Sequence, residues 1–279
     1  MERIEVEKLK YRYPLTETNA LDDVSFTISE GEFIGIVGEN NAGKSTLCQA
    51  LVGLVPHFYK GLYDGKVMVC GKNVRESSVS ELSENVGLAF QNPFTQVTGA
   101  KVTVYEEVAF GLENLGIPRD EMEKRVTEAL ELLGISEYRD RNPFDLSGGQ
   151  MQRVALAGVI AMKPDVIILD EPTSQLDPKG SEEVFQAVQQ LSEKGMTIIM
   201  VEHKMEKIAA YSDRVMLLSN GKVVDFATPH EIFSREDIHD YGVIEPVYTQ
   251  VAKGLGLILE NGLYPVTVTE LSQLMKGER

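Results

Sequence analysis

A glycine-rich octapeptide near the N-terminus places the strongest constraint on how this chain folds. Its sequence, GENNAGKS over residues 38–45, fits the pattern G-x-x-x-x-G-K-[ST] of a phosphate-binding loop. The apolar run at 33–37 is typical of a buried strand, and residues 46–52 are typical of a helix. The motif requires this order of strand, loop and helix, so we expect a phosphate group to bind here.

The residue types in this loop explain how it would hold an anion. Gly38 and Gly43 allow the loop to curl so that its N–H groups point inward, and the following helix adds the positive end of its dipole. Lys44 supplies a full charge to the outer phosphates, and Ser45 offers a hydroxyl to a magnesium ion. The predicted binding residues are Gly38, Glu39, Asn40, Asn41, Ala42, Gly43, Lys44, Ser45 and Thr46.

Composition limits the classes of function that remain. The formal net charge is −16, so a general nucleic-acid surface is not expected, because phosphate contacts need clustered Lys and Arg. Cys48 and Cys70 lack metal-ligand spacing, which favours free thiols in a reducing cytosol. We expect no signal peptide, and no apolar run approaches the roughly 20 residues that span a bilayer. Any membrane association is therefore expected to go through a partner protein.

Hydrophobic patterns along the chain predict an α/β fold. Residues 4–9 and 24–28 alternate apolar and polar side chains, as half-exposed strands of an antiparallel sheet do, and 66–70 are a candidate third strand. Between the first two of these strands, residues 11–14 are expected to form an exposed aromatic loop. Runs at 86–90, 166–169 and 197–201 indicate buried parallel strands, with a helical block from Val104 to Leu133 inserted between them.

The last part of the core and the C-terminal region have weaker signals. Residues 214–218 and 222–226 flank an Asn-Gly turn and predict a hairpin. Residues 243–259 predict one or two amphipathic helices, and Thr267 with Glu270 predicts a capping box for a last helix. No recognisable chemistry follows Ser234, so we expect a packing or dimerisation role there.

Polar side chains follow two of the predicted parallel strands. Asp170 and Glu171 come directly after the run at 166–169, and His203 comes two residues after the run at 197–201. Ligands bind at the carboxyl ends of strands in open α/β sheets. We expect Asp170 to hold magnesium, Glu171 to polarise an attacking water, and His203 to contact the outermost phosphate.

A second glycine-containing segment, LSGGQ at 146–150, has two interpretations. Ser147 and Gln150 have the spacing of a capping box, which starts a helix at Gly148. The same Ser147, Gly148, Gly149 and Gln150 would also leave N–H groups free to bind an anion. Spacing alone does not separate the two interpretations.

Taken together, these motifs resemble the ATP-binding cassette (ABC) ATPases. The resemblance rests on the phosphate-binding loop, LSGGQ and Asp170-Glu171 in this order, and covers roughly residues 4–233. It implies a P-loop NTPase with a parallel core sheet, an antiparallel β subdomain, a helical subdomain at about 92–162 and a small C-terminal extension. The nucleotide-binding domain would be 1–235 and the extension 236–279.

The resemblance also implies roles for individual residues. Tyr13 would stack on adenine, and Gln91 would contact magnesium and water as the Q-loop glutamine. Residues 174–177 resemble the D-loop, with Asp177 near the nucleotide, and His203 resembles the switch histidine. The chain departs from the common pattern at Asn41, where many cassettes carry Gly, and at Gln175, where a small residue is common. Since Asn tolerates a left-handed backbone, we expect the loop to survive.

Residues 90–96 and 108–116 are similar to energy-coupling-factor (ECF) ATPases, which power vitamin and micronutrient importers. This likeness implies a second ATPase subunit, a transmembrane coupling protein, a membrane substrate-binding subunit and a peripheral place on the cytoplasmic face of the membrane. ATP and Mg²⁺ would be the cofactors, and no nucleic acid is expected.

The implied mechanism is a two-subunit clamp. Each ATP would lie between the phosphate-binding loop of one subunit and the LSGGQ segment of the other, and Glu171 would polarise water for attack on the γ-phosphate. Three alternatives remain: a conventional ABC transporter ATPase, a soluble ABC ATPase acting on nucleic acid or ribosomes, and a non-catalytic scaffold. The acidic single cassette disfavours the second, and the intact set of Lys44, Asp170, Glu171 and His203 disfavours the third.

Overall fold

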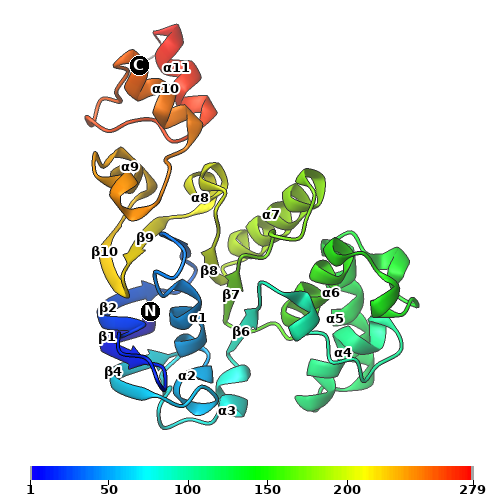
Figure 1. The fold of residues 1–279 in the computed structure, drawn as a ribbon. Coiled ribbons are helices and arrows are strands. Elements are labelled where there is room, and N and C mark those ends of the chain that lie inside the picture. Colours follow the sequence, from blue (N-terminus) through cyan, green and yellow to red (C-terminus); the bar gives the residue numbers. More distant parts are fainter. Residues whose placement is uncertain (1, 278–279) are drawn as a thin grey trace.

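The computed structural model describes residues 2–277 and is built on two β-sheets (Figure 1). The larger sheet has six strands in the order β10-β9-β3-β8-β7-β6 and is parallel except for β10, which pairs antiparallel with β9. Its strands are β3 (Phe33–Val37), β6 (Val86–Ala89), β7 (Val166–Asp170), β8 (Thr197–Val201), β9 (Arg214–Ser219) and β10 (Lys222–Ala227).

The three central strands of this sheet are buried on both faces. Every residue of β3, β7 and β8 is buried, which explains why their sequences are continuously apolar rather than alternating. Side chains alternate between two cores: Ile34 and Ile36 face one, while Phe33 and Val37 face the other. A sheet covered on both faces keeps its strand ends fixed, and the functional side chains follow those ends.

The smaller sheet is antiparallel, in the order β2-β1-β4-β5. Its strands are β1 (Glu2–Arg12), β2 (Leu21–Ser29), β4 (Leu62–Val69) and β5 (Lys72–Asn73). Helix α1 (Lys44–Leu51) shares a hydrophobic core with this sheet and one face of the larger one. The expected aromatic loop at 11–14 was wrong in part, because β1 runs on to Arg12 and Tyr11 is fully buried. The Tyr11 hydroxyl donates to the Tyr59 carbonyl at 2.9 Å, which satisfies it inside the core.

Helices cover the other face of the larger sheet and extend beyond its edge. Three of them, α4, α5 and α6, pack together beside β6 and lie apart from the smaller sheet (Figure 1). Thr103 and Glu106 form a complete capping box at the start of α4, so the local sequence fixes where this helix begins. The helices before Arg235 are α2 (Leu54–His57), α3 (Val79–Ser83), α4 (Val104–Asn114), α5 (Arg119–Leu132), α6 (Gly148–Ala161), α7 (Pro178–Glu193), α8 (Met205–Tyr211) and α9 (Pro229–Ser234), with 3₁₀ turns η1 (Pro93–Thr95), η2 (Ser136–Tyr138) and η3 (Pro143–Asp145).

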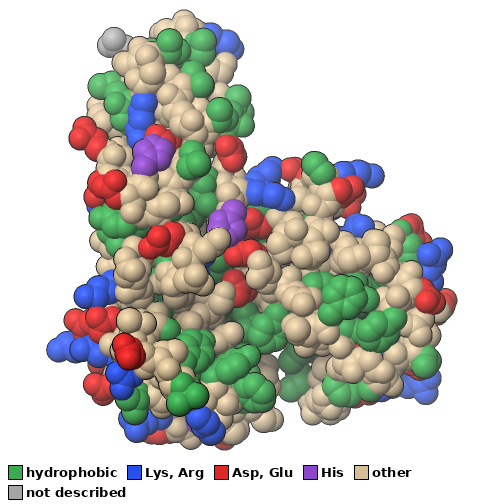
Figure 2. Space-filling view, viewed as in Figure 1, with side chains coloured by type: hydrophobic (Ala, Val, Ile, Leu, Met, Phe, Trp, Pro, Cys, Tyr) green, Lys and Arg blue, Asp and Glu red, His purple; other side chains and the backbone are tan. Residues whose placement is uncertain are grey.

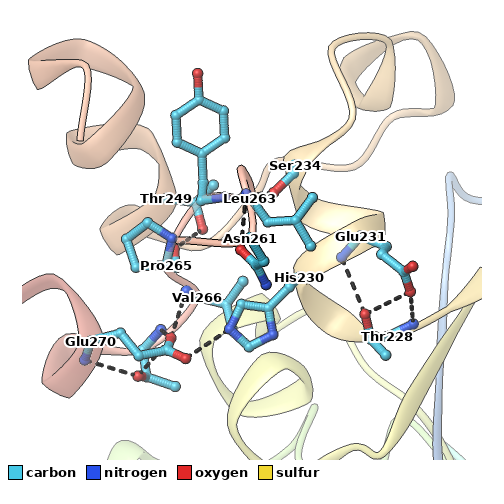
Figure 3. Close-up of polar contacts among 12 residues, drawn as sticks. Thr228, His230, Glu231, Ser234, Thr249, Asn261, Leu263, Pro265, Val266 and Glu270 are labelled. Carbon is cyan, nitrogen blue, oxygen red and sulfur yellow. Dashed lines mark hydrogen bonds and ion pairs between the residues drawn. The ribbon is translucent and has the colours of Figure 1, made fainter. Parts of the chain in front are cut away.

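The C-terminal region forms a small unit of η4 (Ile238–Tyr241), α10 (Val247–Leu255) and α11 (Val268–Lys276) at the end of the molecule beyond α9 (Figure 1). His230 Nε2 on α9 lies 2.7 Å from Glu270 Oε1 on α11 (Figure 3). The Thr249 hydroxyl donates to the Pro265 carbonyl at 2.7 Å, which fixes the loop between α10 and α11. The predicted capping box of Thr267 and Glu270 is confirmed.

This unit also reaches the phosphate-binding loop. Gly242 follows η4 with φ 67°, and a Cβ at this position would lie 2.8 Å from the Glu39 Cβ. Only glycine fits both this backbone conformation and this spacing. Within residues 2–277, no helix has the length and apolar character needed to cross a membrane.

Candidate nucleotide site

A cavity of about 880 Å³ opens at the carboxyl ends of the central parallel strands. It gathers the phosphate-binding loop, the aromatic segment after β1 and three side chains from the ends of other strands. The lining residues are Tyr13, Thr16, Thr18, Asn19, Ala20, Asn40, Asn41, Gly43, Lys44, Ser45, Thr46, Gln91, Glu171 and His203. Ten of these fourteen are residues that the sequence predicted, so the motifs converge on one place.

The loop before α1 adopts the curled conformation that its glycines permit. Gly38 has φ 148°, and a Cβ there would lie 2.0 Å from the Leu218 carbonyl oxygen. Gly43 has φ 102° and caps α1, and its Cβ would lie 2.4 Å from the Ala20 carbonyl oxygen. Asn41 has φ 66°, the left-handed conformation that we expected Asn to tolerate in place of glycine. The backbone at Asn41 therefore has the conformation that glycine adopts readily and Asn tolerates.

Lys44 lies across the inside of the loop. Its Nζ donates to the carbonyls of Gly38 and Glu39, both at 2.8 Å, and the residue is only 6% exposed. Burial lowers the pKa of this ammonium, while the carboxylates of Glu171 and Asp170 oppose the shift. A buried cation held only by neutral carbonyls is an incomplete arrangement, and a phosphate would complete it.

Asp170 and Ser45 fit a magnesium ion. Asp170 is 7% exposed, and its Oδ1 has no hydrogen-bond partner in the described part of the chain. Burial raises the pKa of this carboxyl, and a hydrogen bond with the Ser45 hydroxyl opposes the shift. No three His, Cys, Asp or Glu side chains among residues 2–277 group closely enough to hold a metal by themselves. A hydroxyl and one carboxylate still suit Mg²⁺, because this ion commonly takes its remaining ligands from phosphate and water.

Glu171 is held by two side chains from other segments. His203 Nε2 lies 3.0 Å from Glu171 Oε1, and Gln91 Nε2 donates to Glu171 Oε2. The backbone of Glu171 has φ 51°, a conformation that costs energy for a residue with a long side chain. Its N–H donates to the Val201 carbonyl at 3.0 Å, which ties the end of β7 to the end of β8. The carboxylate can polarise a water molecule in the cavity once the phosphate loop is occupied.

Tyr13 lies at the side of the cavity. Its hydroxyl is 3.1 Å from Thr46 Oγ1 and donates to Gln49 Oε1 at 3.1 Å. Tyr11 and Tyr59 contact its ring edge to face, with centroids 4.8 and 6.3 Å away. The Tyr13 ring is therefore held between α1 and two other tyrosines at the edge of the cavity. Its contact with adenine stays a prediction.

The LSGGQ segment and Asp177 lie outside the cavity. Ser147 and Gln150 form the complete capping box at the start of α6, so the predicted capping box is confirmed, and the anion-binding interpretation stays a prediction. The Asp177 side chain caps α7 by accepting the Gly180 N–H at 2.7 Å. The two segments meet, because a Cβ on Gly149 would lie 3.3 Å from the Gln175 carbonyl oxygen. Within one chain these residues make a second surface rather than part of the first site.

The sequence missed several residues of the site. Thr16, Thr18, Asn19 and Ala20 line the cavity from the turn between β1 and β2. Polar turn residues carry no motif, and only the pairing of β1 with β2 brings this turn over the phosphate-binding loop. Four other predicted residues are not part of the cavity lining, namely Gly38, Glu39, Ala42 and Asp170.

Comparison with known proteins agrees with this arrangement. Residues 21–174 match the family model described as ABC transporter. A putative ABC transporter ATP-binding protein of Pyrococcus abyssi is 45% identical over 253 residues, which is 90% of each chain. The energy-coupling factor transporter ATP-binding protein EcfA1 of Streptococcus sanguinis is 44% identical over 254 residues, 90% of this chain and 88% of the relative.

Two solved structures are also similar. The first is cbiO1 of Clostridium perfringens, described as part of the ABC transporter complex cbiONQ, with 36% identity, a TM-score of 0.73 and coverage of 85% of this chain and 92% of that one. The second is the dimeric ATP-binding cassette MJ0796 bound to ADP and Pi, with 27% identity, a TM-score of 0.72 and coverage of 81% and 98%.

Proposed function

The chain belongs to the ABC transporter family of ATP-binding proteins, and we propose that it is the ATPase subunit of an ECF-type importer of a vitamin or another micronutrient. The observation that carries the proposal is the likeness to EcfA1 over 254 residues, which is 90% of this chain. The likeness to cbiO1, which belongs to a transporter complex, supports it. ATP binding and hydrolysis follow from the family itself.

In the proposed reaction, ATP occupies the 880 Å³ cavity with its phosphates on the loop before α1. Lys44 leaves its carbonyl contacts and pairs with the β- and γ-phosphates. Ser45, Asp170 and Gln91 are the proposed magnesium site, and the ion would neutralise charge that develops on the phosphates. Glu171 polarises the attacking water, and His203 holds Glu171 and contacts the γ-phosphate.

The proposal gives a role to the second surface, where the chain has its other glycine-containing helix start. We place Ser147, Gly148, Gly149 and Gln150 of one subunit over the γ-phosphate bound by the other, with Asp177 beside them. The free N–H groups at the start of α6 then face the phosphate. This arrangement needs a dimer, and the MJ0796 cassette with ADP and Pi is described as dimeric.

The remaining partners are proposed from the likeness to ECF proteins. A transmembrane coupling protein and a membrane substrate-binding subunit would hold the chain as a peripheral protein on the cytoplasmic face of the membrane. The C-terminal extension presents three exposed apolar side chains one turn apart on α10, namely Val247, Val251 and Leu255. Apolar side chains also show on the surface of this unit in Figure 2. We assign this stripe to contact with the second ATPase subunit.

Co-purification tests the importer assignment. The tagged chain is expressed in its own host, membranes are solubilised in mild detergent, and the proteins that elute with it are identified. Recovery of a transmembrane coupling protein with a small membrane substrate-binding subunit is the expected result. A conventional pair of permease domains would keep the transporter and contradict the ECF assignment, and purely ribosomal or DNA-associated partners would contradict both.

A further inference from the structure

A buried carboxylate joins the two strand ends that carry the catalytic pair. Glu202 lies between β8 and His203 and is 4% exposed. It accepts one hydrogen bond from the Thr173 hydroxyl, through Oε1, and another from the His203 backbone N–H at 2.9 Å, through Oε2. Both donors are neutral groups. Burying a carboxylate costs free energy, so the two hydrogen bonds that Glu202 accepts indicate a role beyond packing.

The two contacts hold the segments on either side of Glu171. Thr173, itself 2% exposed, lies two residues after Glu171 and opens the turn that leads to Asp177. In this turn the Ser174 N–H donates to the Glu171 carbonyl and the Leu176 N–H to the Thr173 carbonyl, both at 3.2 Å. Glu202 therefore restrains the segment that keeps Glu171 in its strained conformation at φ 51°.

The other contact fixes the histidine. His203 has a half-exposed side chain, and its Nε2 reaches Glu171 Oε1 at 3.0 Å. The backbone on which this ring turns is held by Glu202 Oε2. One carboxylate thus anchors both partners of the Glu171–His203 contact from inside the protein, and it does not line the nucleotide cavity.

We propose that Glu202 is a positioning residue for ATP hydrolysis, which keeps Glu171 and His203 aligned through Thr173 and the His203 backbone. The inference rests on the ATPase activity of the family and not on the importer assignment. Misalignment of a reacting group by about 1 Å lowers a rate by roughly a hundredfold, so loss of this anchor lowers kcat. The KM for ATP should change little, because the hydrogen bonds of Glu202 go to Thr173 and the His203 backbone and not to the phosphate-binding loop or Tyr13.

Side-chain chemistry supplies matched variants. In Glu202→Gln, the amide oxygen accepts the His203 N–H and the amide nitrogen donates to the Thr173 oxygen, since a hydroxyl both donates and accepts. Both links survive without the charge. Glu202→Ala removes both links. Thr173→Val keeps the shape of Thr173 and removes its hydrogen bond to Glu202. Thr173→Ser keeps the hydroxyl and therefore this hydrogen bond.

The test is steady-state ATP hydrolysis by the full chain, with its partner subunits where these are needed for wild-type turnover. We expect Glu202→Ala to lower kcat roughly ten- to a hundredfold with unchanged KM, and Thr173→Val to lower it in the same way. Glu202→Gln and Thr173→Ser retain most of the wild-type kcat. If Glu202→Ala does not fold, the Thr173→Val and Thr173→Ser pair gives the same comparison.

Three results would overturn the assignment: wild-type kcat in both Glu202→Ala and Thr173→Val, a Glu202→Gln variant as slow as Glu202→Ala, or a loss confined to KM. An inactive wild-type chain would instead count against the ATPase function, so the two failures are distinguishable. The co-purification of membrane partners tests the importer assignment, and its result does not affect the role proposed for Glu202.

Discussion

At the residue scale, the site keeps two charged groups that burial disfavours. Burial lowers the pKa of Lys44 and raises the pKa of Asp170, so in both cases the fold shifts the protonation equilibrium toward the neutral form. The charged forms are the ones that a phosphate and a metal ion require. These two residues therefore lower the free energy of unfolding of the nucleotide-free chain, and ligand binding raises it again.

The Asp170→Asn variant tests this at one residue. Because the pKa of Asp170 is raised in the folded state, its charge destabilises the fold at pH above that value. The variant should have a higher free energy of unfolding at neutral pH. The gain should shrink as pH falls toward the ordinary pKa of aspartate, where both states are protonated. Denaturant unfolding of the nucleotide-free protein across a pH series measures this.

The same variant should bind ATP about tenfold or more weakly with Mg²⁺, since a contact with a charged group contributes ~1.5–3 kcal/mol. Binding without Mg²⁺ is the control and should change little. Destabilisation at neutral pH together with unchanged Mg²⁺ dependence would contradict the role given to Asp170.

At the element scale, the start of α6 combines two requirements. Ser147 caps the helix by accepting the Gln150 N–H at 3.3 Å, and Gln150 returns the bond to the Ser147 N–H at 2.9 Å. The same helix start is the surface that we place over the γ-phosphate of a second subunit. A substitution that keeps the cap and repels phosphate separates the two roles.

Ser147→Asp is that substitution. Aspartate is as good a helix cap as serine, so the melting temperature should stay near the wild-type value, while its negative charge opposes the γ-phosphate and turnover should fall at least ~100-fold. Ser147→Ala is the matched control, because it removes the helix cap without adding a charge. Its free energy of unfolding should fall by about 1 kcal/mol. Calorimetry and phosphate release measure the two effects. Full turnover in Ser147→Asp would show that this segment is a helix cap only.

Elements with strong local signals could be predicted from the sequence, and those that depend on distant packing could not. The continuous apolar runs gave β7 and β8, and the capping residues gave the starts of α6 and α11. Tyr11 was placed in an exposed loop, because nothing local shows that β2 pairs with β1 up to Leu21 and buries it. Glu202 was overlooked for a similar reason, since its partner Thr173 lies 29 positions away.

In the candidate site too, residues with a local motif could be predicted from the sequence and residues brought in by distant packing could not. Lys44, Ser45, Glu171, Gln91 and His203 carry motifs, and the structure gathers them in one cavity. The turn at 16–20 carries none and joins the cavity only through the fold. Ser147 and Asp177 belong to the predicted site only if a second subunit supplies them.

At the scale of the whole molecule, the C-terminal extension is linked to the nucleotide site. Gly242 contacts Glu39 of the phosphate-binding loop, and the Val247 N–H donates to Glu206 on α8 at 3.3 Å. His230 joins α9 to α11 through Glu270. An extension docked in this way presents α10 in a fixed orientation, which suits a lasting contact between subunits.

The Val251→Glu variant tests that contact. Val251 is 41% exposed in the middle of the α10 stripe, so the folded chain should tolerate a charge there, while burial of that charge in an interface should weaken association at least about tenfold. Analytical ultracentrifugation of this chain with its partner ATPase, without nucleotide, measures it. Gln273→Glu, an exposed position on α11, is the control and should associate as the wild type does. Unchanged association in Val251→Glu would move the interface elsewhere.

We propose that this chain hydrolyses ATP with Glu171 as the residue that polarises water. Phosphate release by the purified complex is compared between wild type and Glu171→Gln. The variant should still bind ATP with Mg²⁺ and hold the two ATPase subunits together, while its turnover should fall at least ~100-fold because the general base is lost. Wild-type turnover in Glu171→Gln would show that Glu171 does not have this role.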